Sequence, residues 1–205
     1  MIAIVDYGSG NVRAIANVYR RLNVPCTVAS TPAELRAADR IILPGVGAFD
    51  QVMSALNSSG LRAPLERAVL EDGKPLLGIC VGMQLLADRS EEGGAEGLGW
   101  IRGIVHRMDV DSSQRLPVPH MGWNAIEPLR QSELFEGVNL QMGYYFLHSY
   151  VFGSQAPDTL AVARYGREIC AAVNKGAIYG VQFHPEKSHT PGIRLLQNFA
   201  TIKRL

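Results

Sequence analysis

The sequence has little of what marks nucleic-acid-binding, membrane or secreted proteins. Its 20 lysines and arginines face 19 acidic residues, for a net charge of +1, so no basic surface for nucleic acid is expected. The cysteines Cys26, Cys80 and Cys170 form neither a disulfide framework nor the paired spacing of a zinc site. No apolar run approaches the roughly 20 residues that span a bilayer, and no basic segment of a signal peptide precedes the first apolar residues. We therefore expect a cytoplasmic protein without a metal, a membrane or a nucleic acid.

The length and composition are those of a globular protein. With 205 residues, 47% of them hydrophobic and 19% charged, the chain can bury a substantial core. We expect a single domain over residues 1–205, because no linker-like segment divides the chain. The balanced charge favours a small uncharged substrate or a protein partner over a polyion.

The first half of the chain alternates short apolar runs with longer amphipathic ones, which is the pattern of an α/β protein. Strand–helix–strand repetition predicts an open, twisted, mostly parallel sheet flanked by helices. Ligands bind at the carboxyl ends of such strands, so the loops 6–11 and 44–48 should meet Cys80 at one edge of the sheet. Strands are expected at 2–5, 26–29, 40–43 and 76–79, and helices at 11–22, 32–37, 49–57, 62–71 and after Cys80.

After residue 97 the pattern changes to strands joined by turns, which predicts an antiparallel extension of the sheet. The apolar spacing of residues 192–202 predicts a final helix that packs back onto the sheet. The polar segment 109–119, which ends in two prolines, is predicted to be a surface loop. The expected strands of this half cover 98–108, 121–126, 144–152, 159–164, 169–173 and 178–183.

The segment around Cys80 carries the strongest chemical signal. A buried strand leads into this cysteine and then directly into an apolar helix, which is the arrangement of a nucleophile elbow. An elbow strains the backbone of its central residue and needs small neighbours, and Gly78 and Gly82 lie two residues before and after it. The thiol should stand exposed at a helix N-terminus, whose unpaired N–H groups favour the thiolate. Cys80 is the candidate nucleophile, whereas Cys26 and Cys170 lie in apolar surroundings typical of packing.

A cysteine nucleophile needs a base, and His184 has the best context of the five histidines. It follows a strong strand and precedes Pro185, which disfavours helix at His184. Glu186 lies two residues further on, on the same side of an extended backbone, where its carboxylate can orient the imidazole. Cys80, His184 and Glu186 are therefore a candidate catalytic triad. A metal pair of His184 and His189 is disfavoured, because neither a third ligand nor helical spacing supports it.

Two glycine-containing loops precede predicted helices. Gly47 lies in the loop after a strand, where exposed backbone N–H groups can stabilise an oxyanion, and the N–H of Val81 is a second candidate donor. The loop 6–11 has two glycines of a dinucleotide fingerprint, but Arg13 stands where the third belongs. We therefore expect no nicotinamide cofactor.

Together these motifs resemble the class I glutamine amidotransferases, which release ammonia from glutamine at a Cys–His–Glu site. Residues 78–84 resemble the nucleophile motif of the family, and residues 180–188 resemble its His–Glu motif. The resemblance spans nearly the whole chain. Within the family, further segments are similar to those of glutaminase subunits of imidazole glycerol phosphate synthases from histidine biosynthesis, namely 6–11, 44–47, 120–124, 144–150 and Lys187.

This resemblance implies the class I amidotransferase fold and the hydrolysis of L-glutamine to glutamate and ammonia without a cofactor. It also implies a heterodimer with a (β/α)8-barrel cyclase subunit, which takes the ammonia through an internal channel and makes imidazole glycerol phosphate and aminoimidazole carboxamide ribonucleotide from a phosphoribulosyl-formimino precursor. Glutaminase activity should stay low until the cyclase docks and binds its ribonucleotide. The family roles carried to this sequence are glutamine contacts from Gln84, Glu92, Ser149 and Tyr150, oxyanion donors at Gly47 and Val81, and partner contacts from Asn11, Trp123, Tyr145 and Lys187.

The residues leave three classes of protein to be compared. The first is a glutaminase subunit, of this synthase or of an amidotransferase serving anthranilate, carbamoyl phosphate or pyridoxal phosphate synthesis. The second is a stand-alone cysteine hydrolase of γ-glutamyl compounds or peptides, which would not need the surface of Trp123, Tyr145 and Lys187. The third is a non-catalytic binding or redox-sensing protein, which would not need His184 as a base.

Overall fold

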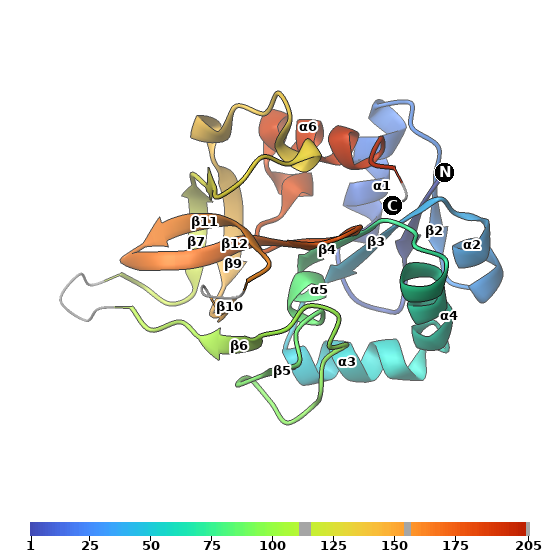
Figure 1. The fold of residues 1–205 in the computed structure, drawn as a ribbon, viewed down its shortest axis with the longest axis horizontal. Helices are drawn as coiled ribbons and strands as arrows, with labels where there is room; N and C mark the ends of the chain where they lie inside the picture. The colour runs from blue at the N-terminus through green and yellow to red at the C-terminus, as the bar shows by residue number, and fades with distance from the viewer. Residues whose placement is uncertain (111–115, 154–156, 204–205) are drawn as a thin grey trace.

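The computed structural model describes residues 1–110, 116–153 and 157–203. Its centre is a sheet of eight strands in the order β2-β1-β3-β4-β13-β12-β11-β8 (Figure 1). The strands from β2 to β13 run parallel to one another, and β12, β11 and β8 continue the sheet in antiparallel fashion. The predicted parallel sheet with an antiparallel extension is thus confirmed. The strands are β1 (Ile2–Val5), β2 (Cys26–Ala29), β3 (Arg40–Gly45), β4 (Leu76–Cys80), β8 (Glu127–Pro128), β11 (Thr159–Tyr165), β12 (Arg167–Lys175) and β13 (Ile178–Val181).

Two small sheets lie beside the antiparallel part of the main sheet. One has the order β10-β6-β5, and the other is a ribbon of β7 and β9. Together they carry the segments that lie across from the carboxyl ends of β3 and β4. Their strands are β5 (Arg89–Ser90), β6 (Ile104–Arg107), β7 (His120–Asn124), β9 (Tyr144–His148) and β10 (Tyr150–Phe152).

Helices cover both faces of the main sheet, with α1 and α6 on one side and α3 and α5 on the other (Figure 1). The buried face of α1 includes Ile15 and Tyr19, and the Tyr19 hydroxyl donates to the Leu196 carbonyl of α6 over 3.1 Å. The two helices are thereby fixed to each other as well as to the sheet. The helices are α1 (Val12–Arg21), α2 (Pro32–Ala37), α3 (Phe49–Ser58), α4 (Arg62–Glu66), α5 (Val81–Gln84) and α6 (His189–Phe199), with a π-helical turn at Arg67–Glu71 and 3-10 turns at Glu133–Phe135, Leu140–Met142 and Pro185–Lys187.

Local sequence explains where two of these helices begin. In α2, the Thr31 hydroxyl accepts from the N–H of Glu34 and the Glu34 carboxylate accepts from the N–H of Thr31, which is a capping box. The last helix begins at His189, three residues before the predicted start. Pro191 is tolerated there because the first turn of a helix leaves its N–H groups without intrahelical partners.

Two further predicted elements are wrong in extent, and the helix after Cys80 is short. The predicted strand 98–108 forms only in its second half, because the N–H groups of Leu98 and Ile101 bond to carbonyls at the end of α5. The predicted helix 62–71 widens into a π-turn after α4. The helix expected after Cys80 is a single turn, because the N–H groups of Leu86 and Ala87 bond to carbonyls three residues back.

The predicted strand 144–152 is two strands. The chain turns at Ser149, so that β9 pairs with β7 while β10 pairs with β6. The remaining predicted elements of the main sheet differ from the structure by at most two residues at their ends. The predicted surface loop 109–119 lies partly outside the described residues, since 111–115 are not described.

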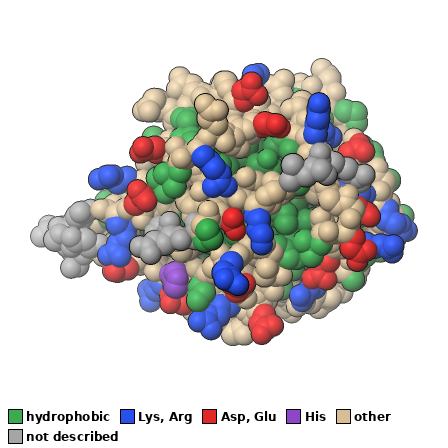
Figure 2. Space-filling view, viewed as in Figure 1, with side chains coloured by type: hydrophobic (Ala, Val, Ile, Leu, Met, Phe, Trp, Pro, Cys, Tyr) green, Lys and Arg blue, Asp and Glu red, His purple; other side chains and the backbone are tan. Residues whose placement is uncertain are grey.

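Charged side chains of both signs are interspersed on the face in Figure 2, in keeping with the net charge of +1. Among the described residues, no helix combines the length and apolar character needed to cross a membrane.

The turn from β4 into α5 requires glycine at both predicted positions. A Cβ on Gly82 would lie 1.9 Å from the carbonyl oxygen of Leu43, and one on Gly78 would lie 2.6 Å from the carbonyl oxygen of Gly82. Contacts this short involve backbone atoms that rotamer changes cannot move. The glycines therefore allow α5 to lie directly against β3 and β4.

Gly82→Ala should lower the free energy of unfolding by at least about 2 kcal/mol, because the added methyl group forces α5 away from β3. Gly94→Ala is the matched control, since its Cβ meets nothing within 4 Å, and it should change stability by less than about 0.5 kcal/mol. Urea unfolding of both variants measures the difference. Equal stability of the two would show that the elbow tolerates a side chain.

Candidate active site

The loops that follow β1, β3 and β4 meet at the carboxyl edge of the main sheet, as predicted. The Ser9 hydroxyl lies 2.9 Å from both the N–H and the carbonyl oxygen of Val46. The Tyr7 hydroxyl donates to the Pro44 carbonyl. These bonds tie the first loop to the loop that carries Gly47.

Cys80 has the strained backbone expected of an elbow. Its φ and ψ are 56° and −115°, a region that costs a residue with a side chain on the order of 1–3 kcal/mol. The predicted exposure of the thiol is wrong, because Cys80 is only 4% exposed. The side-chain nitrogen of Gln182 lies 3.9 Å from the sulfur, and the carbonyl oxygen of Leu147 lies 4.0 Å from it. The thiol is reached through a cavity rather than from the open surface.

His184 and Glu186 form the predicted pair. Nδ1 of His184 lies 2.9 Å from Oε1 of Glu186, and the two side chains are 4% and 1% exposed. The backbone is not extended as predicted, because Pro185 starts a 3-10 turn, and within it the carboxylate still reaches Nδ1 of the ring. The N–H of His184 donates to the Tyr145 carbonyl, and the Ser188 hydroxyl donates to the carbonyl of His184, so the residue is held at both its N–H and its carbonyl.

The surroundings of His184 favour its charged form. Burial lowers its pKa, but hydrogen bonds with Cys80 and Glu186 and the negative charges of both groups outweigh burial and raise the pKa to about 9. A cysteine beside a protonated imidazole is the arrangement of an activated thiol nucleophile.

A cavity of about 320 Å³ opens onto Cys80 and His184. Its size is within the usual range for small-molecule sites. Val46, Leu147 and His148 also line it, without having been predicted. The walls include all the predicted oxyanion and substrate residues: Gly47, Val81, Gln84, Glu92, Ser149 and Tyr150.

Two of the predicted substrate residues, Gln84 and Glu92, also form hydrogen bonds to other parts of the protein. The Gln84 side-chain nitrogen donates to the Tyr150 carbonyl and to Oε1 of Gln182, each over 3.0 Å. One Glu92 oxygen accepts from the N–H of Phe49 at the start of α3, over 2.9 Å. Gln84 therefore holds the cavity wall together, while Glu92 places a carboxylate in the cavity beside the Gly47 loop.

Of the four predicted partner residues, Lys187 lines the cavity, whereas Asn11, Trp123 and Tyr145 do not. The Lys187 ammonium lies 5.5 Å from the centre of the Tyr145 ring. Trp123 is 49% exposed, meets Tyr145 edge-on, and stacks flat on His189 with ring centres 5.1 Å apart. Asn11 donates to Oε1 of Glu186 over 3.5 Å, which connects the first loop to the triad.

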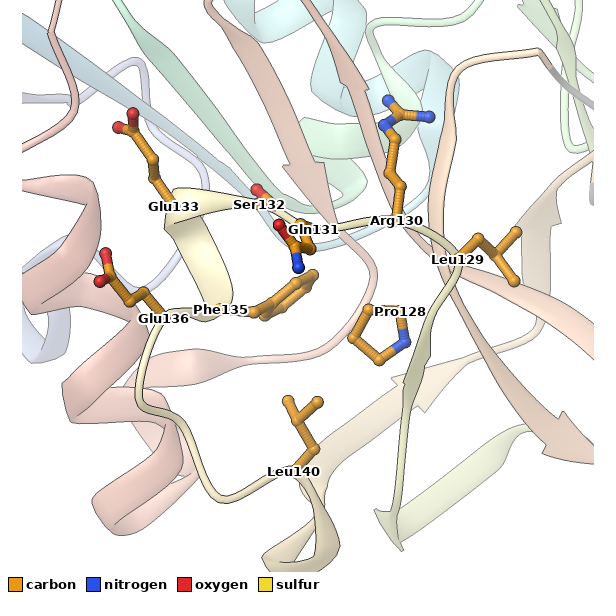
Figure 3. A pocket seen from close by; sticks show the side chains of 9 residues that line it. All are labelled: Pro128, Leu129, Arg130, Gln131, Ser132, Glu133, Phe135, Glu136 and Leu140. Atoms are coloured by element: carbon orange, nitrogen blue, oxygen red, sulfur yellow. The ribbon is translucent and has the colours of Figure 1, made fainter.

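A larger groove of about 800 Å³ lies elsewhere, between residues 128 and 140 (Figure 3). Its lining has apolar Pro128, Phe135 and Leu140 but no cysteine or histidine. It therefore lacks a cysteine–histidine pair, and the smaller cavity is the candidate active site.

Neither Cys26 nor Cys170 lines the cavity of Cys80. Burial raises the pKa of Cys170 to about 12 and also raises that of Cys26, which agrees with a packing role.

Among the described residues, no three histidine, cysteine or acidic side chains are grouped to hold a metal ion. His184 bonds to Glu186 and His189 stacks on Trp123, so these two histidines do not converge.

Known proteins match the chain over nearly its whole length. The family model described as "Glutamine amidotransferase class-I" matches residues 3–202. The chain belongs to the class I glutamine amidotransferases.

Two relatives within this amidotransferase family carry the same name. The "Imidazole glycerol phosphate synthase subunit HisH" of Bdellovibrio bacteriovorus is 52% identical over 204 residues, which is 98% of this chain and 100% of the relative. The protein of the same name from Leptospira borgpetersenii is 45% identical with the same coverage.

Solved structures share the amidotransferase fold. The crystal structure of one glutamine amidotransferase has a TM-score of 0.72 at 20% identity and covers 98% of this chain and all of its own. The structure of PurLQS from Thermotoga maritima has a TM-score of 0.70 at 18% identity and covers 97% of this chain and 96% of its own. At these identities the likeness concerns the fold alone.

Cys80→Ala should lower the pKa of His184 from about 9 toward or below its ordinary value of 6.5. The reason is that burial is then opposed by Glu186 alone. NMR titration of the imidazole measures this, with Cys26→Ala as the control that leaves the pKa in place. An unchanged pKa in Cys80→Ala would show that the cysteine does not hold the proton on His184.

The same pKa sets a dependence of stability on pH. Because the folded-state pKa lies above that of the unfolded chain, the bound proton stabilises the fold fully below pH 6.5 and this contribution is lost as pH rises to about 9. Urea unfolding at pH 6 and pH 9.5 should show a larger loss for the wild type than for Cys80→Ala. An equal loss in both proteins would contradict the coupling.

Proposed function

We propose that this amidotransferase is the glutaminase subunit of an imidazole glycerol phosphate synthase and acts in the cytoplasm in histidine biosynthesis. Relatives of that name, matched end to end at 45–52% identity, support the assignment. The observation that carries the chemistry is that Cys80 and His184 line one cavity while Nδ1 of His184 lies 2.9 Å from Oε1 of Glu186. A single domain over residues 1–205 would contain the whole site.

The reaction begins with attack of the Cys80 thiolate on the carbonyl carbon of the glutamine side-chain amide. His184, which starts protonated, gives its proton to the departing nitrogen, so ammonia leaves and a thioester remains. Neutral His184 then takes a proton from water, which attacks the thioester and releases glutamate. Glu186 stabilises the imidazolium at both stages and holds Nδ1 in place.

Charge that develops on the amide oxygen needs donors, for which we propose the N–H groups of Gly47 and Val81. Both residues line the cavity with Cys80. Glu92 suits the α-amino group of glutamine, because its carboxylate lies at the cavity wall, while Ser149 and Tyr150 would hold the rest of the amino-acid moiety.

The partner is a (β/α)8-barrel cyclase subunit that docks over the mouth of the cavity to form a heterodimer. Trp123 and Met121 expose 49% and 61% of their surface, and Val46, beside the oxyanion loop, exposes 53%. Apolar side chains of this size around an active site suit a protein interface. Docking keeps ammonia away from water, where it would be protonated and lose its nucleophilicity.

Ser9→Ala should raise the glutaminase activity of the isolated chain about fivefold, because it removes a hydrogen bond of about 1 kcal/mol to the Val46 carbonyl and frees the peptide that carries the Gly47 N–H to turn toward the reacting oxygen. Activity in the full complex should change less than twofold if docking already releases this peptide. Ser59→Ala, in a capping bond at the end of α3, is the control. Loss of basal activity in Ser9→Ala would instead show that the bond supports the active loop.

The function itself is tested by mixing the chain with the cyclase subunit, glutamine and the phosphoribulosyl-formimino ribonucleotide. Wild type should form imidazole glycerol phosphate and Cys80→Ala should not, and ammonium salt should restore product with Cys80→Ala because the cyclase uses ammonia directly. No product with wild type would indicate another acceptor. Glutamine hydrolysis that does not respond to the cyclase and its ribonucleotide would indicate a stand-alone hydrolase.

A further inference from the structure

Two buried histidines beside the cavity have no part in the mechanism above. His120 begins β7 and His148 ends β9, and the two residues face each other in the ribbon. They are 2% and 6% exposed. Nδ1 of His120 lies 3.0 Å from Nε2 of His148, and His148 lines the cavity that holds Cys80.

The bonds at the two ends of this pair determine where the protons lie. Nδ1 of His148 is 3.1 Å from the Tyr150 carbonyl oxygen, which can only accept, so Nδ1 carries the hydrogen. Nε2 of His148 is then the acceptor for Nδ1–H of His120. Nε2 of His120 in turn accepts from the side-chain nitrogen of Asn124 over 3.3 Å. The same Asn124 nitrogen also donates to the Arg164 carbonyl over 2.9 Å.

One direction of donation therefore runs from Asn124 through His120 and His148 to the Tyr150 carbonyl. A second proton on either ring would place two N–H groups against each other along this series of bonds. Burial agrees with singly protonated rings, since it lowers the pKa of His120 to about 4 and, together with the neighbouring His120, that of His148 to about 3.

The series of bonds ends where the substrate wall is built. The Tyr150 carbonyl accepts from His148 and also from Gln84 over 3.0 Å. The carbonyl of Ser149 accepts from the N–H of Met108 over 2.9 Å. The turn at 149, where β9 leaves for β10, is therefore held by one bond from the ribbon and two from the rest of the domain.

The other end of this hydrogen-bond series, at His120 and Asn124, belongs to strand β7, which also carries exposed side chains. Along β7, Met121 and Trp123 are exposed while His120 is buried between them and the core. The His120 ring is stacked on Phe146 and Tyr165, with ring centres 4.8 and 4.0 Å apart. A shift of β7 would thus be transmitted through a tightly packed ring to the Tyr150 carbonyl.

We propose that Asn124, His120 and His148 are positioning residues that hold the Ser149–Tyr150 segment in its glutamine-binding position and connect this segment to the exposed face of β7. The proposal rests on the proposed function, because it takes glutamine as the substrate of this cavity. None of the three residues belongs to the proposed Cys–His–Glu triad, so we expect them to act on substrate affinity.

Kinetics of the complex with the cyclase and its ribonucleotide test the role. His148→Leu removes both ring nitrogens and should raise KM for glutamine at least tenfold, with kcat changed less than threefold. His148→Asn keeps a donor near the position of Nδ1 and should keep KM within threefold of wild type. Tyr165→Phe, which keeps the ring on His120 but loses the hydroxyl bond to Pro117, is the control and should leave KM unchanged. Wild-type KM in His148→Leu, or an equal rise of KM in both His148 variants, would overturn the proposal.

Asn124→Asp separates bonding from packing, because it changes the donor to an acceptor with almost no change of shape. It should raise KM at least fivefold, and an unchanged KM would overturn the proposal. A direct readout comes from ¹⁵N NMR of the wild-type chain alone, which should show both rings neutral with the proton on Nδ1. A proton on Nε2 of either ring would also overturn it. Absence of glutaminase activity in the wild-type complex would refute the proposed function, whereas the NMR result would still decide the direction of the bonds.

Discussion

The close contact between β3 and α5 sets the position of the nucleophile. The carbonyl of Leu43 comes so near to Gly82 that no side chain fits there, and this leaves Cys80 with a positive φ between a strand and a helical turn. Strain at one residue persists only when its surroundings are rigid. Here the surroundings are the central strands of a parallel sheet, which are buried along almost their whole length. The chemistry therefore depends on backbone packing more than on any side-chain contact.

The charges of the two histidines in the cavity are set by burial and by their bonded neighbours. His184 keeps its proton because Cys80 and Glu186 both bond to it, although burial acts in the opposite direction. His148 lines the same cavity and stays neutral, because burial lowers its pKa and no anion among the described residues is bonded to it. Two histidines in one cavity thus have opposite protonation states, and the difference comes from whether the bonded neighbour is an anion or a carbonyl and a second imidazole.

The cavity is assembled from segments that belong to different layers. The Gly47 loop comes from the parallel half of the sheet, whereas Ser149 and Tyr150 come from the point where β9 leaves one small sheet and β10 enters another. Each segment is held by few bonds, such as Ser9 to Val46 on one side and His148 to Tyr150 on the other. Val46, at the first of these points, is exposed, and so is Trp123, which shares strand β7 with His120. A protein docked there would contact both segments at once.

Much of this could be predicted from the sequence because it is local. Glycines two residues before and after Cys80, and a proline between His184 and Glu186, restrict the backbone whatever the rest of the chain does, and the alternation of apolar runs predicts the parallel sheet. Pairing across the fold could not be predicted in this way. Cys80 is buried because Leu147 and Gln182 cover it, and His120 meets His148 because β7 and β9 pair in one register. The sequence by itself thus determined the elbow, the candidate triad and the family, whereas the tertiary structure decided the burial of the thiol and the protonation of the histidines, because both depend on neighbours distant in the chain.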